Sequence, residues 1–327
     1  MIRFAQEKDI DRIRDFIRQY WKKKNHIFSR NRDFFEYEHC IGEEVSFVIS
    51  EDEKGGINGI LGYIPYGKTD RDIMTVMWKV IHTSDPVLGI RILQFLLENG
   101  NVRIAASPGI GKNTMGIYRF LGYYVGKMTQ WYRLREQKEY RIGKIEDKTR
   151  PNTPEKQFTL REFQNFEELE NCFDFIGYAQ GKPKPYKEKW YIEKRYFQHP
   201  IYRYRIFGIV GDREVVEAVV VVRVVECKGA RIIRWIDCFG AIEQMKYISK
   251  ALDNLMESEQ AEYIDCLEAG LPEGLFWEGG WLKVENSGNI IPNYFNPYVC
   301  ENIEIYFFST DKELILFKGD GDQDRPS

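Results

Sequence analysis

The fold is decided by the stretch IMTVMWKVI (residues 73–81), HTSDPVLG (82–89) and IRILQFLL (90–97). The first block is rich in β-branched and large apolar residues, which is typical of a buried strand. In the third block, polar and apolar residues recur at the spacing of a helix that buries one face. The middle block, with Pro86 and Gly89, therefore predicts a turn that leads from a strand into a helix. The first amides of such a helix lack an intrahelical partner, so the turn is a candidate anion site.

A second unit of the same kind follows. We predict a strand at 102–107, a turn at 108–111, a short helix at 113–121 and a further strand at 123–134. The end of the short helix reads YRFLGY, which places Tyr118 four residues before the pair Gly122-Tyr123.

This order of elements, with Tyr118 before Gly122-Tyr123, resembles the GNAT superfamily of N-acyltransferases. The resemblance covers about 135 residues. It implies that the first turn holds the pyrophosphate of an acyl-CoA, used as co-substrate. The turn departs from the family pattern Gln/Arg-x-x-Gly-x-Gly/Ala, because Pro86, Gly89 and Arg91 stand at its three positions and only the glycine fits.

The resemblance also implies roles for individual residues. Tyr118 would be the general acid toward the leaving sulfur, and the strand at 78–81 would donate a backbone N–H to the thioester carbonyl. His82 is a candidate base, because it is the only group in this unit that titrates near neutral pH; a water relay would replace it. A packing role for Tyr118 and a turn position without function for His82 are the alternatives. The expected acyl-CoA site consists of Val80, Ile81, Leu88, Gly89, Ile90, Arg91 and Asn113.

Composition and charge exclude several classes of protein. Lys and Arg number 47 against 50 Asp and Glu, and the net charge of −3 offers no basic excess for binding nucleic acid. The longest apolar run, 215–225, is too short to span a membrane. Six scattered cysteines without a Cys-x-x-Cys pair predict reduced thiols in a cytoplasmic protein, with no metal site. The chain begins directly with a strand-like segment, so we expect no signal peptide.

The 327 residues are enough for two domains. A polar stretch with two prolines at 144–154 predicts a linker, which divides the chain into 1–150 and 151–327. The second part repeats the coarse order of elements, ending with a strand at 303–308 that should close its sheet. Gly240 stands where its pyrophosphate turn would begin, but no tyrosine matches Tyr118. We therefore predict an α/β (α+β) protein of two tandem GNAT-like domains, each a mixed, mostly antiparallel sheet flanked by helices. Residues 1–150 would hold the acyl-CoA, and 151–327 would be a degenerate domain that binds the acceptor or serves as a brace.

Three later segments are unusual. IPNYFNPY (291–298) combines aromatic rings with amides, which suits a sugar or a nucleobase and equally suits a tight loop without a ligand. The insertion GKPKPYKEKW (181–190) is a domain clasp, a phosphate contact or a solvated loop. The acidic stretch at 317–326 has a calcium-like composition but lacks the glutamate of an EF-hand loop.

The two-domain organisation and the last segment resemble bacterial acyltransferases of surface-polysaccharide pathways. That resemblance implies acyl transfer to the amino group of a nucleotide-linked sugar, a dTDP-linked 3-amino-3,6-dideoxyhexose, for O-antigen, capsule or S-layer glycan synthesis. A non-catalytic GNAT-like binding or regulatory protein, and a GNAT enzyme acting on a small amine or peptide, are the alternatives. The sequence leaves the oligomeric state open. The expected acceptor residues are Asn293, Tyr294, Asn296 and Tyr298.

Overall fold

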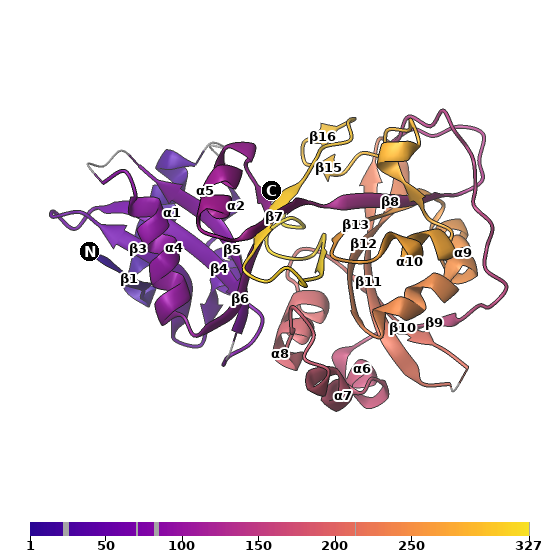
Figure 1. The fold of residues 1–327 in the computed structure, drawn as a ribbon, viewed down its shortest axis with the longest axis horizontal. Coiled ribbons are helices and arrows are strands. Elements are labelled where there is room, and N and C mark those ends of the chain that lie inside the picture. Colours follow the sequence, from indigo (N-terminus) through magenta and orange to yellow (C-terminus); the bar gives the residue numbers. More distant parts are fainter. Residues whose placement is uncertain (22–25, 70, 82–84, 213, 327) are drawn as a thin grey trace.

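The computed structural model describes residues 1–21, 26–69, 71–81, 85–212 and 214–326. Within them the chain forms two eight-stranded mixed sheets and one two-stranded hairpin, with helices flanking both sheets (Figure 1). This confirms the predicted fold class. None of the described helices is long and apolar enough to cross a membrane.

The first sheet holds the strand–turn–helix unit that the sequence singled out. Its only parallel pair among the described strands is β5 with β6, and the other neighbours are antiparallel. The predicted turn at 108–111 is wrong, because β6 continues through Ile110. In spatial order, the strands are β1 (Ile2–Ala5), β3 (Glu44–Glu51), β4 (Ile57–Pro65), β5 (Arg71–Val80), β6 (Val102–Ile110), β17 (Tyr306–Ser309) and β7 (Tyr124–Lys127), with β2 (Cys40–Ile41) beside β3.

Helices cover both faces of this sheet. One face packs against α1 (Ile10–Tyr20), α2 (Ile27–Arg30) and α3 (Arg32–His39), and its core is rich in phenylalanine. The other face packs against α4 (Leu88–Asn99), whose buried side is aliphatic, and against α5 (Met115–Phe120). The apolar spacing of the sequence thus appears as one buried stripe on each amphipathic helix.

The second sheet contains the other parallel pair, β12 with β13. Helices α6 (Phe166–Cys172), α7 (Phe175–Gln180), α8 (Lys189–Ile192), α9 (Ser249–Glu259) and α10 (Glu273–Glu278) accompany it, and β15 (Tyr294–Phe295) with β16 (Tyr298–Val299) forms the hairpin. In spatial order, its strands are β14 (Leu282–Lys283), β8 (Thr129–Leu134), β13 (Ala261–Ala269), β12 (Ala230–Gly240), β11 (Val216–Cys227), β10 (Arg205–Val210) and β9 (Thr159–Phe163), with β18 (Leu316–Phe317) beside β13.

The two sheets exchange strands: the first sheet contains β17 from the end of the chain, and the second contains β8 from the first half. The single strand predicted at 123–134 is two strands, because β7 pairs with β17 whereas β8 pairs with β13 in the second sheet. The strand predicted at 303–308 to close the second sheet is also corrected: β17 lies between β6 and β7 in the first. Figure 1 shows β8 running from one sheet to the other. The division near residue 150 stays a prediction for the domains, since the sheets themselves exchange strands across it.

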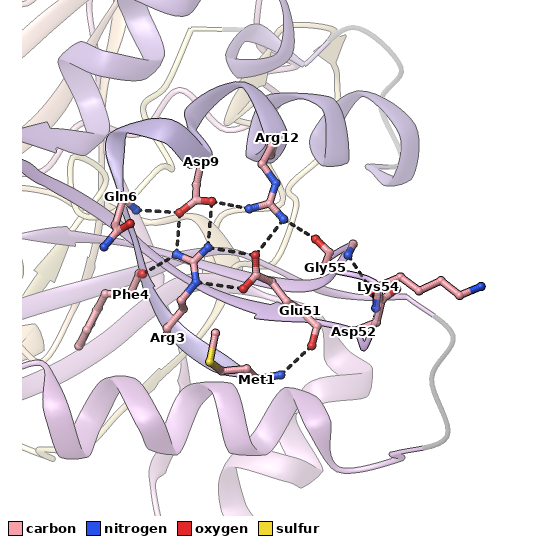
Figure 2. A network of polar contacts seen from close by, with 11 residues as sticks. Met1, Arg3, Phe4, Gln6, Asp9, Arg12, Glu51, Asp52, Lys54 and Gly55 are labelled. Atoms are coloured by element: carbon pink, nitrogen blue, oxygen red, sulfur yellow. Dashed lines mark hydrogen bonds and ion pairs between the residues drawn. The ribbon is translucent and has the colours of Figure 1, made fainter.

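A buried carboxylate fixes the start of the chain against the first sheet (Figure 2). Asp9 accepts hydrogen bonds from Arg3 at 2.6 and 3.0 Å and from Arg12 at 2.6 Å, and Arg3 also pairs with Glu51. Burial alone would raise the pKa of Asp9, but Arg3, the Gln6 amide and Arg12 lower it to about 2. The carboxylate of Asp9 thus binds arginines and the Gln6 amide rather than amides of α1.

The basic insertion joins the two halves. Lys187 is buried, and its amine lies 2.6 Å from Asp237 of β12 and 2.9 Å from Asp320. Tyr66 of the first half donates a hydrogen bond of 2.7 Å to Asp320. Burial alone would lower the pKa of Lys187, but the two carboxylates raise it above its ordinary value. Of the three interpretations of this insertion, a domain clasp, a phosphate contact or a solvated loop, the contacts of Lys187 support the domain clasp.

Candidate active site

The parallel strands β5 and β6 separate part of the way along the first sheet. Their paired register runs from Arg71 and Val102 to Met74 and Ala106, while both strands continue beyond it. At the point of separation the Ser107 hydroxyl donates a hydrogen bond of 2.6 Å to the Thr75 carbonyl. The facing edges of the two strands beyond this point are therefore open to an extended ligand.

A bulge in β5 directs its second half. The register with β4 shifts between Ile60 and Gly62, and Met77 has a φ of 51°. Such a left-handed conformation is costly for a non-glycine residue and is found where the surrounding structure enforces it. The bulge places the consecutive residues Val76 and Met77 on the same face, in the phenylalanine-rich core, so the alternation shifts by one residue and Trp78 packs against the α4 core.

A cavity of about 510 Å³ lies in this fork. Its walls come from the end of α1, from β5, from β6, from the start of α5, and from the last part of the chain. The described lining residues are Tyr20, Trp21, Thr75, Val76, Met77, Trp78, Lys79, Ser107, Pro108, Gly109, Ile110, Gly111, Thr114, Tyr118, Asp322 and Arg325.

Tyr118 stands in the wall of this cavity on α5. Its ring stacks on Phe308 of β17 at 3.9 Å between centroids and lies 5.7 Å from the ring of Trp78. Burial raises the pKa of the Tyr118 hydroxyl above its ordinary value, so the group keeps its proton at neutral pH. In the described part of the chain this hydroxyl makes no hydrogen bond, which leaves the proton available to a ligand.

Trp78 carries an unpaired donor next to the fork. Its indole Nε1 is buried and has no hydrogen-bond partner among the described residues. A Cβ added at Gly89 would lie 3.3 Å from the Trp78 ring, so the indole and the first turn of α4 are in close contact. A buried donor without an acceptor is costly, and a ligand acceptor would remove that cost.

The first turn of α4 offers amides to an anion. The Gly89 and Ile90 amides have no acceptor in the described chain, while Val87 donates to the Asp85 carboxylate at 3.0 Å. Asp85 also forms an ion pair of 2.7 Å with Arg91. The turn therefore holds one carboxylate and one guanidinium beside its open amides, and the guanidinium is free to rotate toward a phosphate because it is more than half exposed.

The structure places the predicted acyl-CoA residues beside the cavity rather than in its wall. Tyr118 lines it, as do Trp78 and Lys79 of the strand at 78–81 that is predicted to donate a backbone N–H; His82 lies outside the described residues. The Ile81 amide donates to the Asn58 carbonyl at 3.0 Å, so it is already paired. Leu88 is buried in the α4 core, and Asn113 is exposed in a 3₁₀ turn. Val80 ends β5, and Gly89, Ile90 and Arg91 lie in the first turn of α4.

The predicted acceptor residues lie at the β15–β16 hairpin, and none lines the cavity in the fork. Asn293 is buried and donates to the Ile303 carbonyl at 2.7 Å, and Asn296 is exposed. Lysine amines already lie over two of the rings: Lys318 over Tyr294 at 5.0 Å and Lys228 over Tyr298 at 4.2 Å. Each amine occupies one face of its ring, so only the other face remains for a nucleobase.

Several lining residues had no signal in the sequence. Met77 belongs to an ordinary strand pattern, and no local feature of the sequence indicates the bulge. Asp322 and Arg325 come from the acidic stretch whose composition is calcium-like, and they reach the cavity only because the chain returns to the first half. In that stretch Asp320 pairs with Lys187 and Asp324 pairs with Arg223, so both carboxylates already have cationic partners.

A second cavity, of about 500 Å³, lies at the matching place in the second sheet, where β12 and β13 separate. Lys187 and its partner Asp237 lie in its wall, together with Pro183 and Pro185 of the basic insertion. Gly240 ends β12 with a φ of 94°, and a 3₁₀ helix (Ile242–Tyr247) stands between it and α9. The strand does not lead directly into a long helix here, so the candidate anion site at the start of α4 has no counterpart in the described part of the second half.

Solved structures share this two-sheet fold. A conserved protein of unknown function from Enterococcus faecalis, described as a probable N-acyltransferase, matches 96% of this chain and 73% of its own, at 10% identity and a TM-score of 0.57. A GCN5-related N-acetyltransferase from Anabaena variabilis matches 94% of this chain and 72% of its own, at 13% identity and a TM-score of 0.56. Another from Kribbella flavida matches 94% and 70%, at 11% identity and a TM-score of 0.52.

The likeness covers both halves of the chain, and it establishes a shared GNAT-type fold. No family model matches the sequence. No curated protein matches it either.

Proposed function

We propose that this protein is an acyl-CoA-dependent N-acyltransferase whose reaction takes place in the fork between β5 and β6. The observation that carries the proposal is the fork itself: two parallel strands separate around a cavity of about 510 Å³, with Tyr118 in its wall and the open amides of α4 at its end. An extended pantetheine arm fits open strand edges, and a pyrophosphate fits the start of a helix.

The residues of the fork supply what the reaction needs. An amine attacks the thioester carbonyl, the C–N bond forms as the C–S bond breaks, and the leaving sulfur needs a proton. Tyr118 holds a proton at neutral pH and is the donor in this scheme. Open amides of β5 near the bulge would stabilise the carbonyl oxygen as charge develops on it.

The acceptor in this proposal is the amino group of a nucleotide-linked sugar, a dTDP-linked 3-amino-3,6-dideoxyhexose, acylated in the cytoplasm for surface-polysaccharide synthesis. The second half supports a large acceptor, because it brings the hairpin and the last part of the chain next to the fork. Tyr294 is the predicted acceptor residue with a contact toward the cavity: its hydroxyl lies 3.5 Å from Gln323, whose amide reaches the Pro108 carbonyl. All six cysteines are unpaired, in keeping with a reducing compartment.

The test is direct acyl transfer. Purified protein is incubated with acetyl-CoA and dTDP-3-amino-3,6-dideoxyglucose, and the N-acetylated sugar and free CoA are measured by mass spectrometry and thiol release. We expect equal amounts of both products. Binding of CoA without any product, across this sugar and a panel of small amines and peptides, would instead favour a non-catalytic binding protein, for which the carboxylate of Asp85 in the turn is the supporting observation.

A further inference from the structure

The last part of the chain forms a wall of the cavity in the first half. We call residues 318–326 the returning segment, because they follow β18 of the second sheet and reach the fork of the first. Figure 1 shows the C-terminal end beside β7, between the two sheets. The fork therefore contains side chains that the first 150 residues do not supply.

Two buried carboxylates hold the returning segment in place. Asp320 accepts from Tyr66 at 2.7 Å and pairs with Lys187, and its own side chain is fully buried. Asp324, also buried, forms an ion pair with Arg223 and accepts from the Tyr204 hydroxyl at 3.0 Å. Because both carboxylates are anchored to neighbouring elements, the residues between them have a defined position.

The first half is shaped to receive this segment. The Gln323 side-chain amide donates to the Pro108 carbonyl of β6 at 3.3 Å. A Cβ at Gly109 would lie only 2.0 Å from that amide nitrogen, and Gly109 has a φ of 89°. Glycine is therefore required at this point both by the backbone conformation and by the approach of Gln323.

Asp322 lies between the two anchors and faces the cavity. One carboxylate oxygen, Oδ2, forms an ion pair of 2.6 Å with Arg325, and Arg325 reaches the Met77 sulfur at 3.7 Å. The other oxygen, Oδ1, has no partner among the described residues, and 22% of the side chain is exposed. Among the described lining residues Asp322 is the only carboxylate.

We infer that Asp322 is a catalytic residue, which binds the ammonium group of the acceptor through Oδ1 and takes one of its protons. The inference rests on the proposed function. An amine is protonated near neutral pH and cannot attack until it loses a proton, so the site needs an anion next to the reacting nitrogen. Arg325 holds the other oxygen and so fixes the direction of the carboxylate.

The protons balance in this scheme. The ammonium gives one proton to Asp322, and the neutral nitrogen then attacks the thioester carbon. As the C–N bond forms and the C–S bond breaks, the departing sulfur receives the proton of Tyr118. The second proton that the nitrogen loses passes through solvent to the Tyr118 phenolate and restores its hydroxyl. The products are the amide, free CoA and one proton released to solvent from Asp322. The scheme also explains why the returning segment must reach the first half: the donor side of the fork contains no carboxylate among the described lining residues.

The experiment compares Asp322→Asn with wild type on two acceptors, using acetyl-CoA as donor. The first acceptor is dTDP-3-amino-3,6-dideoxyglucose, which carries an ammonium group. The second is hydroxylamine, which is uncharged at neutral pH and needs no anion to deprotonate it. Glu301→Gln, which removes an exposed carboxylate away from the cavity, is the matched control. Acetyl-CoA affinity is measured by calorimetry in all three proteins.

We expect Asp322→Asn to lower kcat/KM for the amino sugar by about 100-fold, which is the lower end of a general base's contribution, and to leave transfer to hydroxylamine and the acetyl-CoA affinity within about threefold. Raising the pH from 7 to 9 should restore part of the lost rate, because more of the sugar is then a free amine. An unchanged kcat/KM for the amino sugar, or an equal loss with both acceptors, would overturn the inference alone. Wild-type protein that transfers to neither acceptor would overturn the proposed function and this inference with it.

Discussion

The chemistry proposed for the fork depends most closely on Tyr118. Its hydroxyl keeps a proton because burial raises its pKa, and its ring is held by Phe308 on one side and Trp78 on another. Tyr118→Phe keeps both ring contacts and removes only the proton. We expect kcat to fall by about 100-fold, because a thiolate is a good leaving group and the loss of an acid typically costs 10² to 10⁴.

The measurement for Tyr118→Phe is steady-state kinetics together with calorimetric titration of CoA. The affinity for CoA should stay close to that of wild type, since the packing is preserved. A wild-type kcat at saturating substrate would return Tyr118 to a packing role.

Lys318 predicts a particular dependence of stability on pH. Its side chain is 2% exposed, and burial, with Arg234 nearby, lowers its pKa from 10.5 to about 7. Below pH 7 the folded protein must bury the charged amine. Between about pH 7 and 10.5 the unfolded chain binds the additional proton, so stability rises with pH through that window.

Lys318→Met keeps the length of the side chain and removes this titration. We expect the free energy of unfolding of the variant to exceed that of wild type at pH 6 by on the order of a few kcal/mol, with a higher unfolding temperature, and the difference to shrink by pH 10. Calorimetric unfolding across that range is the measurement. A difference that does not vary with pH would show that the amine finds a partner in the folded protein.

At the scale of elements, the proposed donor site depends on the first turn of α4. Gly89 lies in the first turn of α4, where an added Cβ would stand 3.3 Å from the Trp78 ring. Gly89→Ala should push the indole toward the fork and narrow the approach to the open amides, while alanine itself favours the helix. We expect about a tenfold loss of CoA affinity by calorimetry and no fall in the unfolding temperature. An unchanged affinity would place the pyrophosphate elsewhere.

A comparison of predicted and observed elements shows which parts of the fold can be predicted from the sequence. Local patterns predict β5 and α4 close to their observed bounds, because hydrophobic spacing is a property of neighbouring residues. The exchange of β8 and β17 could not be predicted in this way. Whether 129–134 pairs with one sheet or the other depends on partners more than 100 residues away, such as the register of Asp265 with Tyr132.

The candidate site likewise contains residues that local sequence predicts and residues that it does not. Tyr118 was predicted from a local motif, and it lines the cavity. Met77 was not, because a positive φ in a strand comes from the register shift against β4 rather than from the residue itself. Asp322 was not, because its place depends on two anchoring carboxylates whose partners lie far away in the chain. The roles of these residues remain predictions that the experiments above test.

For the whole molecule, the clasp at Lys187 couples the two halves. Its amine faces Asp237 and Asp320 with all three side chains buried. Lys187→Met would leave two buried carboxylates without their cation, and breaking a buried pair in this way typically costs about 3–5 kcal/mol. We expect a clear fall in the midpoint of denaturant unfolding and, because Asp320 anchors the returning segment, a loss of acyl transfer.

Lys184→Met is the matched control, since this lysine belongs to the same insertion but forms exposed pairs with Asp311 and Glu313. Exposed ion pairs contribute little to stability, so the midpoint of denaturant unfolding of Lys184→Met should stay near that of wild type. Equal shifts for the two variants would show that the clasp is not a principal link between the halves.

The central claim is that acyl-CoA binds in the fork of the first half and not in the matching cavity of the second. Gly111 lines the fork, and a Cβ there would meet nothing within 4 Å, so Gly111→Trp can fill the cavity without disturbing the fold. Gly274, on α10 next to the second cavity, has the same freedom and gives the control Gly274→Trp. Calorimetric titration with acetyl-CoA then tests the claim. The prediction is one site per chain in wild type and in Gly274→Trp, with at least about tenfold weaker binding in Gly111→Trp; equal affinity in both variants, or no binding by wild type, would contradict it.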